Sequence, residues 1–372
     1  MGIDGPITVR RARFQCSQSK ALYCPADALL DLPPGEVTVS LARRAARLGT
    51  KMSFAELEEE LREQHDVRVS DTTLDGLMNA VGAVAQRDRQ ARLVALEELP
   101  AGRSREEAVT VKLESPKRMY ISCDGITYRT RYREADPEHQ GEKRVIYQEM
   151  KVGTVFWQDH KERWHKQVVN GRENPERFGL SLWALAVECG MLKCPEVIFI
   201  SDGGGWCQSV AQMYFKDALR ILDWYHLVEH VWEAGRQLYP TDEAAAKRWV
   251  DTSVDHLHDS SGIGLLRHLE HCLQARGGGA ASAWEKQALE SLMGYVRPRL
   301  AITDYVEYRA RGMVIGSGMM ESTCKQVVEH RLKGNGMQWS ESGALGMASL
   351  ISHRLNGAWA EFWQSRPLQR AA

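Results

Sequence analysis

The 372-residue sequence has no long apolar run and no excess of charge of one sign. No stretch approaches the roughly 20 uninterrupted apolar residues that a membrane-spanning helix needs, so membrane partners are not expected. The amino-terminal segment carries arginines but no apolar stretch behind them, and we expect no secretory leader. The sequence predicts a cytoplasmic protein.

Paired cysteines are also missing. The eight cysteines are scattered, and none forms a C-x-x-C pair. In a chain of this length they indicate reduced thiols rather than a disulfide framework.

The net charge of −1 excludes a uniformly basic nucleic-acid binder. Basic residues nevertheless concentrate in three segments, 1–20, 117–133 and 297–333. Phosphate binding needs positive charge on one face only. Each segment alone is equally compatible with an ordinary solvated surface, but two of them flank the acidic residues described below.

Residues 38–83 have the pattern of two short helices. Ser53 and Glu56 form a capping-box pattern at the start of the first helix, and Ser70 is a good N-cap for the second. The second helix is expected to end near Gly82. The pattern suits a helix-turn-helix that binds DNA, and it is equally common in plain helical bundles.

From residue 118 the hydrophobic period changes to one of short strands between helices. This alternation predicts a mixed α/β sheet covered by helices. Residues 241–310 are then expected to be wholly helical, with a break at 276–279, and 311–372 end in an aromatic helix. The expected strands are 119–124, 147–157, 196–202 and 218–223, and the expected helices are 176–189, 206–217 and 225–239.

Two of the expected strands end in an aspartate followed by glycine, at Asp124 and Asp202. Sites in α/β sheets form at the carboxyl ends of strands. If these strands are parallel neighbours, the two carboxylates lie a few ångströms apart and repel each other unless a cation intervenes. Oxygen ligands favour Mg²⁺ or Mn²⁺ as that cation.

A third acid, Glu321, lies in the glycine-rich segment 315–325, which runs into an expected helix. Lys325 follows one helical turn beyond it. A carboxylate, a helix start and a lysine together suit a metal ion and a phosphate. Each acid alone is more often a turn or cap residue, so the prediction depends on the combination.

Five segments carry a resemblance to a known family. Ser122–Gly125, Ile200–Gly203, Ile221–His226, Ile315–Glu321 and Gly336–Ser340 occur in the order of the motifs of ISKra-type insertion-sequence transposases. The resemblance covers about residues 10–363. It implies an RNase H-like core of the Asp-Asp-Glu type, with a helical insertion between the second aspartate and the glutamate.

By that resemblance, Asp124, Asp202 and Glu321 are the catalytic and metal-binding residues, while Asp223 and His226 are auxiliary. The predicted divisions are 1–36, a degenerate zinc-ribbon-like segment; 37–116, a helical DNA-binding domain and linker; 117–240, the first part of the catalytic core; 241–310, the helical insertion; and 311–372, the carboxyl-terminal part of the core.

The chain departs from the family at its amino terminus. Relatives often begin with paired cysteines that resemble a zinc ribbon, whereas Cys16 is followed by Ser-Gln-Ser19, and Cys24 does not restore the spacing. Four ligands for a structural zinc ion are lacking, so none is expected.

The expected reaction is metal-dependent cleavage of DNA at the element ends, followed by strand transfer to target DNA. The reaction implies a homo-oligomer on DNA, in the cytoplasm and associated with the nucleoid. Five basic residues are expected to contact the phosphate backbone in a salt-dependent way: Arg309, Arg311, Lys325, Arg331 and Lys333.

Two alternatives remain open. His226, Glu229 and His230 fit the H-x-x-E-H motif of zinc metallopeptidases, with Glu307 as a possible third ligand. That reading leaves Asp124 and the 315–325 segment unexplained. The other alternative is a non-catalytic DNA-binding protein derived from a transposase, which would bind DNA without Mg²⁺-dependent cleavage.

Overall fold

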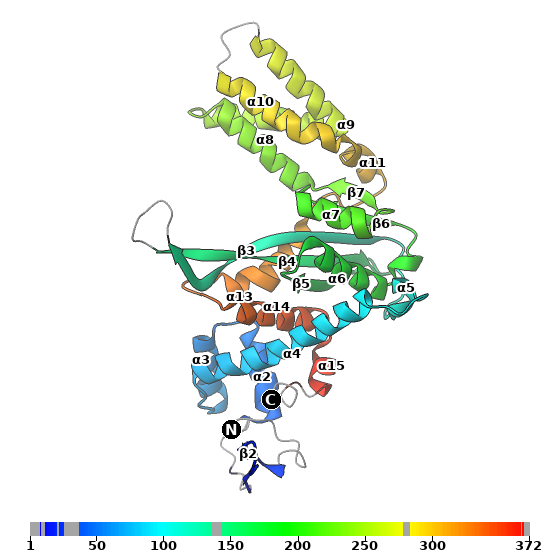
Figure 1. The fold of residues 1–372 in the computed structure, drawn as a ribbon. Helices are drawn as coiled ribbons and strands as arrows, with labels where there is room; N and C mark the ends of the chain where they lie inside the picture. Colours follow the sequence, from blue (N-terminus) through cyan, green and yellow to red (C-terminus); the bar gives the residue numbers. More distant parts are fainter. Residues whose placement is uncertain are drawn as a thin grey trace.

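A five-stranded mixed sheet lies at the centre of the computed structural model (Figure 1). The structure describes residues 8, 12–20, 22–25, 37–135, 143–277, 283–365 and 367. The order of the strands across the sheet is β5-β4-β3-β6-β7. Their bounds are Met119–Ala135 for β3, Lys143–Gln158 for β4, Trp164–Gly171 for β5, Val197–Ser201 for β6 and Leu219–Leu222 for β7.

Strands β3, β4 and β5 form an antiparallel meander, and β6 and β7 run parallel to β3. Helices flank this sheet on both faces. The arrangement is that of an RNase H-like sheet and confirms the predicted fold class. It also confirms that the strands preceding Asp124 and Asp202 are parallel neighbours.

Two strand predictions were wrong. Strand β3 does not stop at Gly125 but continues for ten residues, because it pairs with β4 along a protruding hairpin. The Asp-Gly pair was interpreted as a strand end. Strand β5 was missed altogether, since its sequence mixes polar and apolar residues without regular alternation. The polar run 131–144, whose sequence indicates a hairpin or loop, belongs in part to this hairpin. Residues 136–142 lie outside the described residues.

Helices cover the sheet in three groups. On one face lie α6 (Pro175–Glu188) and α7 (Gly205–Tyr214), with the short η1 (Met191–Lys193) between them. The helical insertion lies at the top of Figure 1 and contains α8 (Trp224–Leu238), α9 (Glu243–Gly277), α10 (Ala283–Val296), η2 (Arg297–Ile302) and α11 (Tyr305–Ala310). The carboxyl-terminal group is α12 (Gly318–Cys324), η3 (Lys325–Glu329), α13 (His330–Leu332), α14 (Glu341–Leu355) and α15 (Trp359–Gln364).

The insertion is helical as expected for 241–310. Helix α9 is interrupted at Ser260 and Ser261, where Ser261 has a φ of +60°. Of the break expected at 276–279, residues 278 and 279 lie outside the described residues.

The amino-terminal helices are α2 (Val39–Gly49), α3 (Phe54–His65) and α4 (Asp71–Glu97), followed by the short α5 (Arg105–Ala108). Both predicted caps are confirmed: Ser53 forms the capping box with Glu56, and the Ser70 side chain accepts from the Thr73 amide. The expected end of the second helix near Gly82 was wrong, because buried residues continue along α4 as far as Leu96.

One buried core joins these helices to the sheet. Leu57 and Leu74 of the amino-terminal helices belong to the same hydrophobic cluster as Tyr128 of β3 and Ile351 of α14. Helices α4 and α14 cross so closely that a Cβ added at Gly82 would lie 2.8 Å from the Gly346 Cα.

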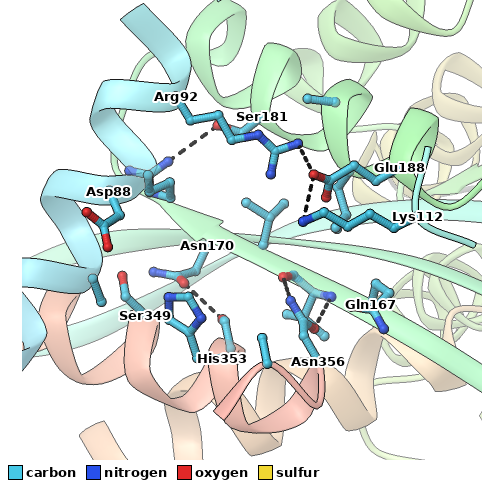
Figure 2. Close-up of a pocket in the computed structure, with 18 of the residues that line it drawn as sticks. Asp88, Arg92, Lys112, Gln167, Asn170, Ser181, Glu188, Ser349, His353 and Asn356 are labelled. Atoms are coloured by element: carbon cyan, nitrogen blue, oxygen red, sulfur yellow. Dashed lines mark hydrogen bonds and ion pairs between the residues drawn. The ribbon is translucent and has the colours of Figure 1, made fainter. Parts of the chain in front are cut away.

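Helices also protect the outer edge of β5. The Asn356 amide accepts from the Val168 N–H at 2.7 Å and donates to its carbonyl at 2.8 Å, so it satisfies an edge backbone that would otherwise pair with another strand. A cavity of about 400 Å³ lies beside it, between α4, β5, α6 and α14 (Figure 2). At its rim Glu188 pairs with both Arg92 and Lys112.

The short strands β1 (Phe14–Gln15) and β2 (Leu22–Tyr23) form an antiparallel pair near the amino terminus. Cys16 and Cys24 follow them as free thiols. Within the predicted zinc-ribbon-like segment 1–36, the structure describes residues 8, 12–20 and 22–25. Arg10 and Arg11 of the basic segment 1–20 lie outside the described residues. Within the described ranges, no helix is long and apolar enough to cross a membrane.

The close crossing of α4 and α14 predicts opposite effects for two glycine substitutions in one helix. Gly82→Ala should lower the free energy of unfolding by about 1–3 kcal/mol, because the new methyl group meets backbone. Gly76→Ala, where an added Cβ meets nothing within 4 Å, should raise it by up to about 1 kcal/mol through helix propensity. Urea unfolding measures both, and equal changes would contradict the crossing.

Candidate acidic site at the carboxyl ends of the parallel strands

Three parallel strands lead to an aspartate at the same level of the sheet. Ser122, Ile200 and Ile221 lie two residues before these aspartates, Asp124, Asp202 and Asp223. Ser122 pairs with Ile200, and Ile200 pairs with Ile221, across the parallel strands. Side chains two residues apart point to the same face, and neighbouring strands lie about 4.8 Å apart. The three carboxylates therefore form one row across β3, β6 and β7.

Asp124 is a partly buried member of this row whose negative charge is disfavoured. Its carboxylate accepts from the Gly125 amide at 2.6 Å. Burial raises the pKa of Asp124, the neighbouring charge of Asp202 raises it further, and His226 opposes that change. This is the electrostatic environment that a bound cation would relieve.

Asp202 lies on a turn that the helical insertion holds in place. Its carboxylate accepts from the Gly204 amide at 2.8 Å, and its carbonyl accepts from the Tyr295 hydroxyl at 2.8 Å. Arg299 donates to the Gly203 carbonyl at 3.1 Å and lies 4.1 Å from the centre of the Tyr295 ring. The end of α10 therefore fixes the loop that carries the second aspartate.

Asp223 has a different role from the other two, because hydrogen bonds occupy its carboxylate. Only 4 % of the residue is exposed, and burial raises its pKa. It accepts from the Tyr225 amide and the Ser317 amide, each at 3.0 Å, and from the Ser317 hydroxyl. Asp223 thus ties the glycine-rich turn before α12 to the end of β7.

Glu321 lies on α12 beside this row but points elsewhere. Its side chain is 64 % exposed and forms an ion pair with Lys325 at 2.5 Å. Helix α12 itself lies close to Asp124. Burial raises the pKa of the Cys324 thiol at the end of this helix, and the nearby charge of Asp124 raises it further. The structure brings Asp124 and Asp202 together and leaves Glu321 paired with lysine.

Across the ranges that the structure describes, no three histidine, cysteine or acidic side chains converge closely enough to hold one metal ion. This holds for the three predicted acids and for the histidines of the H-x-x-E-H motif. The rings of His226 and His230 lie 4.9 Å apart, and each histidine pairs with the acid one helical turn further on. His230 also packs on Tyr295, with 4.0 Å between ring centres.

The predicted phosphate-binding residues differ in their surroundings. Arg309 donates to the backbone carbonyls of Tyr305 and His258. Arg311 pairs with Glu196, and Lys333 lies 3.7 Å from Glu329.

Arg331 departs from the expectation that it contacts DNA. It is 2 % exposed, and its guanidinium lies 4.6 Å from the Phe54 ring centre and 4.8 Å from that of Trp339. Its Nε donates to the Gly49 carbonyl at 2.7 Å, and burial lowers its pKa to about 10. Arg331 packs α2 and α3 against the carboxyl-terminal segment, so we leave it out of the proposed DNA contacts.

Sequence reasoning missed Tyr295 and Arg299. Tyr295 lies in the last turn of α10 and Arg299 in η2, and an aromatic four residues before an arginine there was an available signal. Nothing in the sequence indicated that they reach the Asp202 turn, because the contact spans more than ninety residues.

The fold and the acidic row define a class: an α/β protein with an RNase H-like sheet and carboxylates at the ends of its parallel strands. No protein-family model and no curated protein matches the chain. Among solved structures, the Drosophila P element transposase strand transfer complex is similar at 10% identity and a TM-score of 0.29, covering 88% of this chain and 80% of that chain. A likeness of that degree adds no weight to an assignment of function.

The electrostatics of Asp124 predict that Asp124→Asn stabilises the protein when no divalent ion is present. The folded-state pKa is raised above the unfolded value, so the ionised carboxylate destabilises the fold at neutral pH. The gain in melting temperature should be on the order of 1–3 °C at neutral pH. It should shrink as the pH falls through the folded-state pKa toward the ordinary value of 3.8.

Thermal unfolding across pH measures this effect. Asp217→Asn removes an exposed charge and serves as the control. Loss of stability in Asp124→Asn at neutral pH would show that the acid is not held in a repulsive environment.

Proposed function

We propose that the protein is a DNA transposase of the Asp-Asp-Glu type that cleaves DNA at insertion-sequence ends and transfers the strand to target DNA. The observation that carries the proposal is the row of carboxylates at the ends of β3, β6 and β7. In that row, Asp124 and Asp202 lie close enough for one charge to raise the pKa of the other. An RNase H-like sheet supports the proposal but does not by itself define a function.

The donor set fits Mg²⁺ or Mn²⁺. Asp124 and Asp202 offer carboxylate oxygens, the ligands that these ions prefer, and their mutual repulsion favours a cation between them. Glu321 would complete the set once its ion pair with Lys325 opens. When bound, the divalent ions supply the charge that activates the attacking oxygen and stabilises the leaving oxygen at phosphorus.

Other residues of the chain hold the site in place. Asp223 holds the turn before α12 at the end of β7 through two hydrogen bonds from Ser317, so it would position Glu321. Tyr295 and Arg299 hold the Asp202 turn. Lys325 neutralises Glu321 in the free protein, and phosphate would compete for this lysine when DNA arrives.

The protruding end of the β3–β4 hairpin is the best candidate for a DNA-contacting arm (Figure 1). Among its described residues, Arg131, Arg133, Lys143 and Arg144 are exposed, and Glu134 pairs with Arg144. The sequence between these strands adds the acids Asp136, Glu138 and Glu142, so the proposed contact depends on the basic residues on the strands themselves. Exposed tyrosines lie among these charges, Tyr132 at 49 % and Tyr147 at 61 %. Arg309, Arg311, Lys325 and Lys333 remain proposed phosphate contacts of the core. Two copies on two DNA ends would satisfy the reaction.

The acidic residues provide the first functional test. Asp124→Ala, Asp202→Ala and Glu321→Ala should each reduce Mg²⁺-dependent DNA cleavage on the order of 10³-fold or more, because each removes a metal ligand. Asp251→Ala, at an exposed acid of the insertion, is the matched control and should keep full activity. Cleavage of plasmid and element-end DNA measures the effect.

The outcomes separate the candidate functions. Full activity in one variant removes that residue from the site. DNA binding without cleavage by the wild type favours the non-catalytic derivative, and zinc-dependent peptide hydrolysis favours the metallopeptidase.

The arm gives a second test. Replacing both Arg131 and Arg133 with alanine should weaken binding to DNA of any sequence and reduce the slope of log affinity against log salt by about 2. Lys247→Ala, at an exposed lysine of α9, should leave the slope unchanged. An unchanged slope in the double variant would exclude the arm from the DNA interface.

A further inference from the structure

A second cavity, of about 590 Å³, opens beside the turn that leads to Glu321. Its lining combines aromatic side chains from the sheet, α8 and α9 with Arg309 of α11 and the apolar 313–319 segment. The residues that the argument uses are Phe156, Trp164, Trp224, Tyr225, His258 and Arg309.

One wall of this cavity belongs to the sheet. Trp164 begins β5 and lies 5.9 Å from Phe156 between ring centres, at an angle of 51°. Phe156 is buried and stacks on Tyr120 at 5.1 Å, which gives Trp164 a rigid support. Trp164 itself is 43 % exposed, so much of the indole is open to a ligand.

The start of α8 contributes a second wall. Trp224 packs edge-on against Tyr305 at 4.9 Å, and its amide donates to the Ile315 carbonyl at 3.0 Å. Tyr225 is 62 % exposed, and its ring covers Gly316 so closely that a Cβ there would lie 2.5 Å from it. The glycine allows the tyrosine ring to lie flat against the turn.

Arg309 lines the same cavity and adds a positive charge. Its guanidinium donates to the backbone carbonyls of Tyr305 and His258, which orient it. These acceptors are neutral, so they do not cancel its positive charge. A cation beside aromatic faces suits a nucleotide, because the rings stack on the base while the cation attracts the phosphate.

We infer that this cavity binds a single unstacked nucleobase of the DNA strand beside the acidic site. Exposed aromatic side chains that line a hollow mark a binding surface, and flat rings in more than one wall fit a flat ligand. A base pair inside a duplex cannot enter such a hollow, whereas an extrahelical base can. The inference rests on the proposed action on DNA. It adds that the DNA strand carries one extrahelical base when it binds beside the acidic site.

The position of the cavity gives the bound base a role. Its floor is the segment 313–319, and Ser317 in that segment is the residue that Asp223 holds. Helix α12 with Glu321 follows directly. A base held against this floor therefore contacts the turn that orients the third acid, and it fixes the neighbouring phosphate near the acidic row.

The test compares two DNA probes, a fully paired duplex and the same duplex with one extrahelical 2-aminopurine. The wild type should bind the bulged probe about tenfold more tightly, because stacking on aromatics favours an unpaired base. The fluorescence of 2-aminopurine should fall on binding as the base stacks on Trp164 or Tyr225. Both measurements are made with Ca²⁺ in place of Mg²⁺, so that cleavage does not interfere.

Trp164→Ala and Tyr225→Ala should each lose most of the tenfold preference, and Trp164→Phe should keep it because a phenyl ring still stacks. Trp284→Ala is the matched control, since Trp284 is 48 % exposed on α10 and lies outside the cavity lining. Circular dichroism shows which variants fold, and Trp164→Phe keeps the test informative if an alanine variant does not.

Equal affinity of the wild type for both probes, with unchanged fluorescence, would overturn the inference and leave the proposed function standing. A preference that persists in both folded alanine variants would also overturn it. Failure of the wild type to bind either probe would instead contradict the proposed action on DNA.

Discussion

The repulsion between carboxylates held in one row is the constraint around which the site is organised. Parallel strands in register bring Asp124, Asp202 and Asp223 to one edge of the sheet, and a protein gains no stability from three neighbouring negative charges. The fold satisfies one of them internally, because Asp223 accepts three hydrogen bonds from Tyr225 and Ser317. Asp124 and Asp202 each accept a backbone N–H, from Gly125 and Gly204, yet burial and the charge of Asp202 still raise the pKa of Asp124. A carboxylate with a pKa perturbed in this way is typical of a functional site.

The helical insertion contributes to this arrangement although it lies far along the chain. Tyr295 and Arg299 contact the backbone of the Asp202 turn, so the position of the second acid depends on helix α10 as well as on β6. Backbone contacts fix the turn without adding a charge beside the carboxylate itself. The insertion therefore acts as a support for the site, and its removal would free the loop that carries Asp202.

The sequence was sufficient to predict the features that depend on local pattern. Apolar runs leading to Asp124 and Asp202 indicated the two strands, because side-chain period is a local property. The continuation of β3 past Gly125 depends on its pairing with β4, which no local pattern shows. The apolar run before Asp223 has the same pattern, so the same argument would have placed Asp223 beside Asp124 and Asp202. By contrast, burial of Arg331 between Phe54 and Trp339 depends on three segments meeting in space, and no local pattern distinguishes it from a surface arginine.

The turn before α12 connects the acidic row with the aromatic cavity. Asp223 of the acidic row holds Ser317, and the residues on either side of Ser317, Gly316 and Gly318, line the cavity. A ligand in the cavity and a cation at the acidic row would therefore act on the same turn. The exposed ion pair between Glu321 and Lys325, one helical turn apart, stabilises the helix only slightly, so a phosphate or a cation can displace it at small cost. In the proposed reaction, Glu321 would stay paired with Lys325 until DNA arrives.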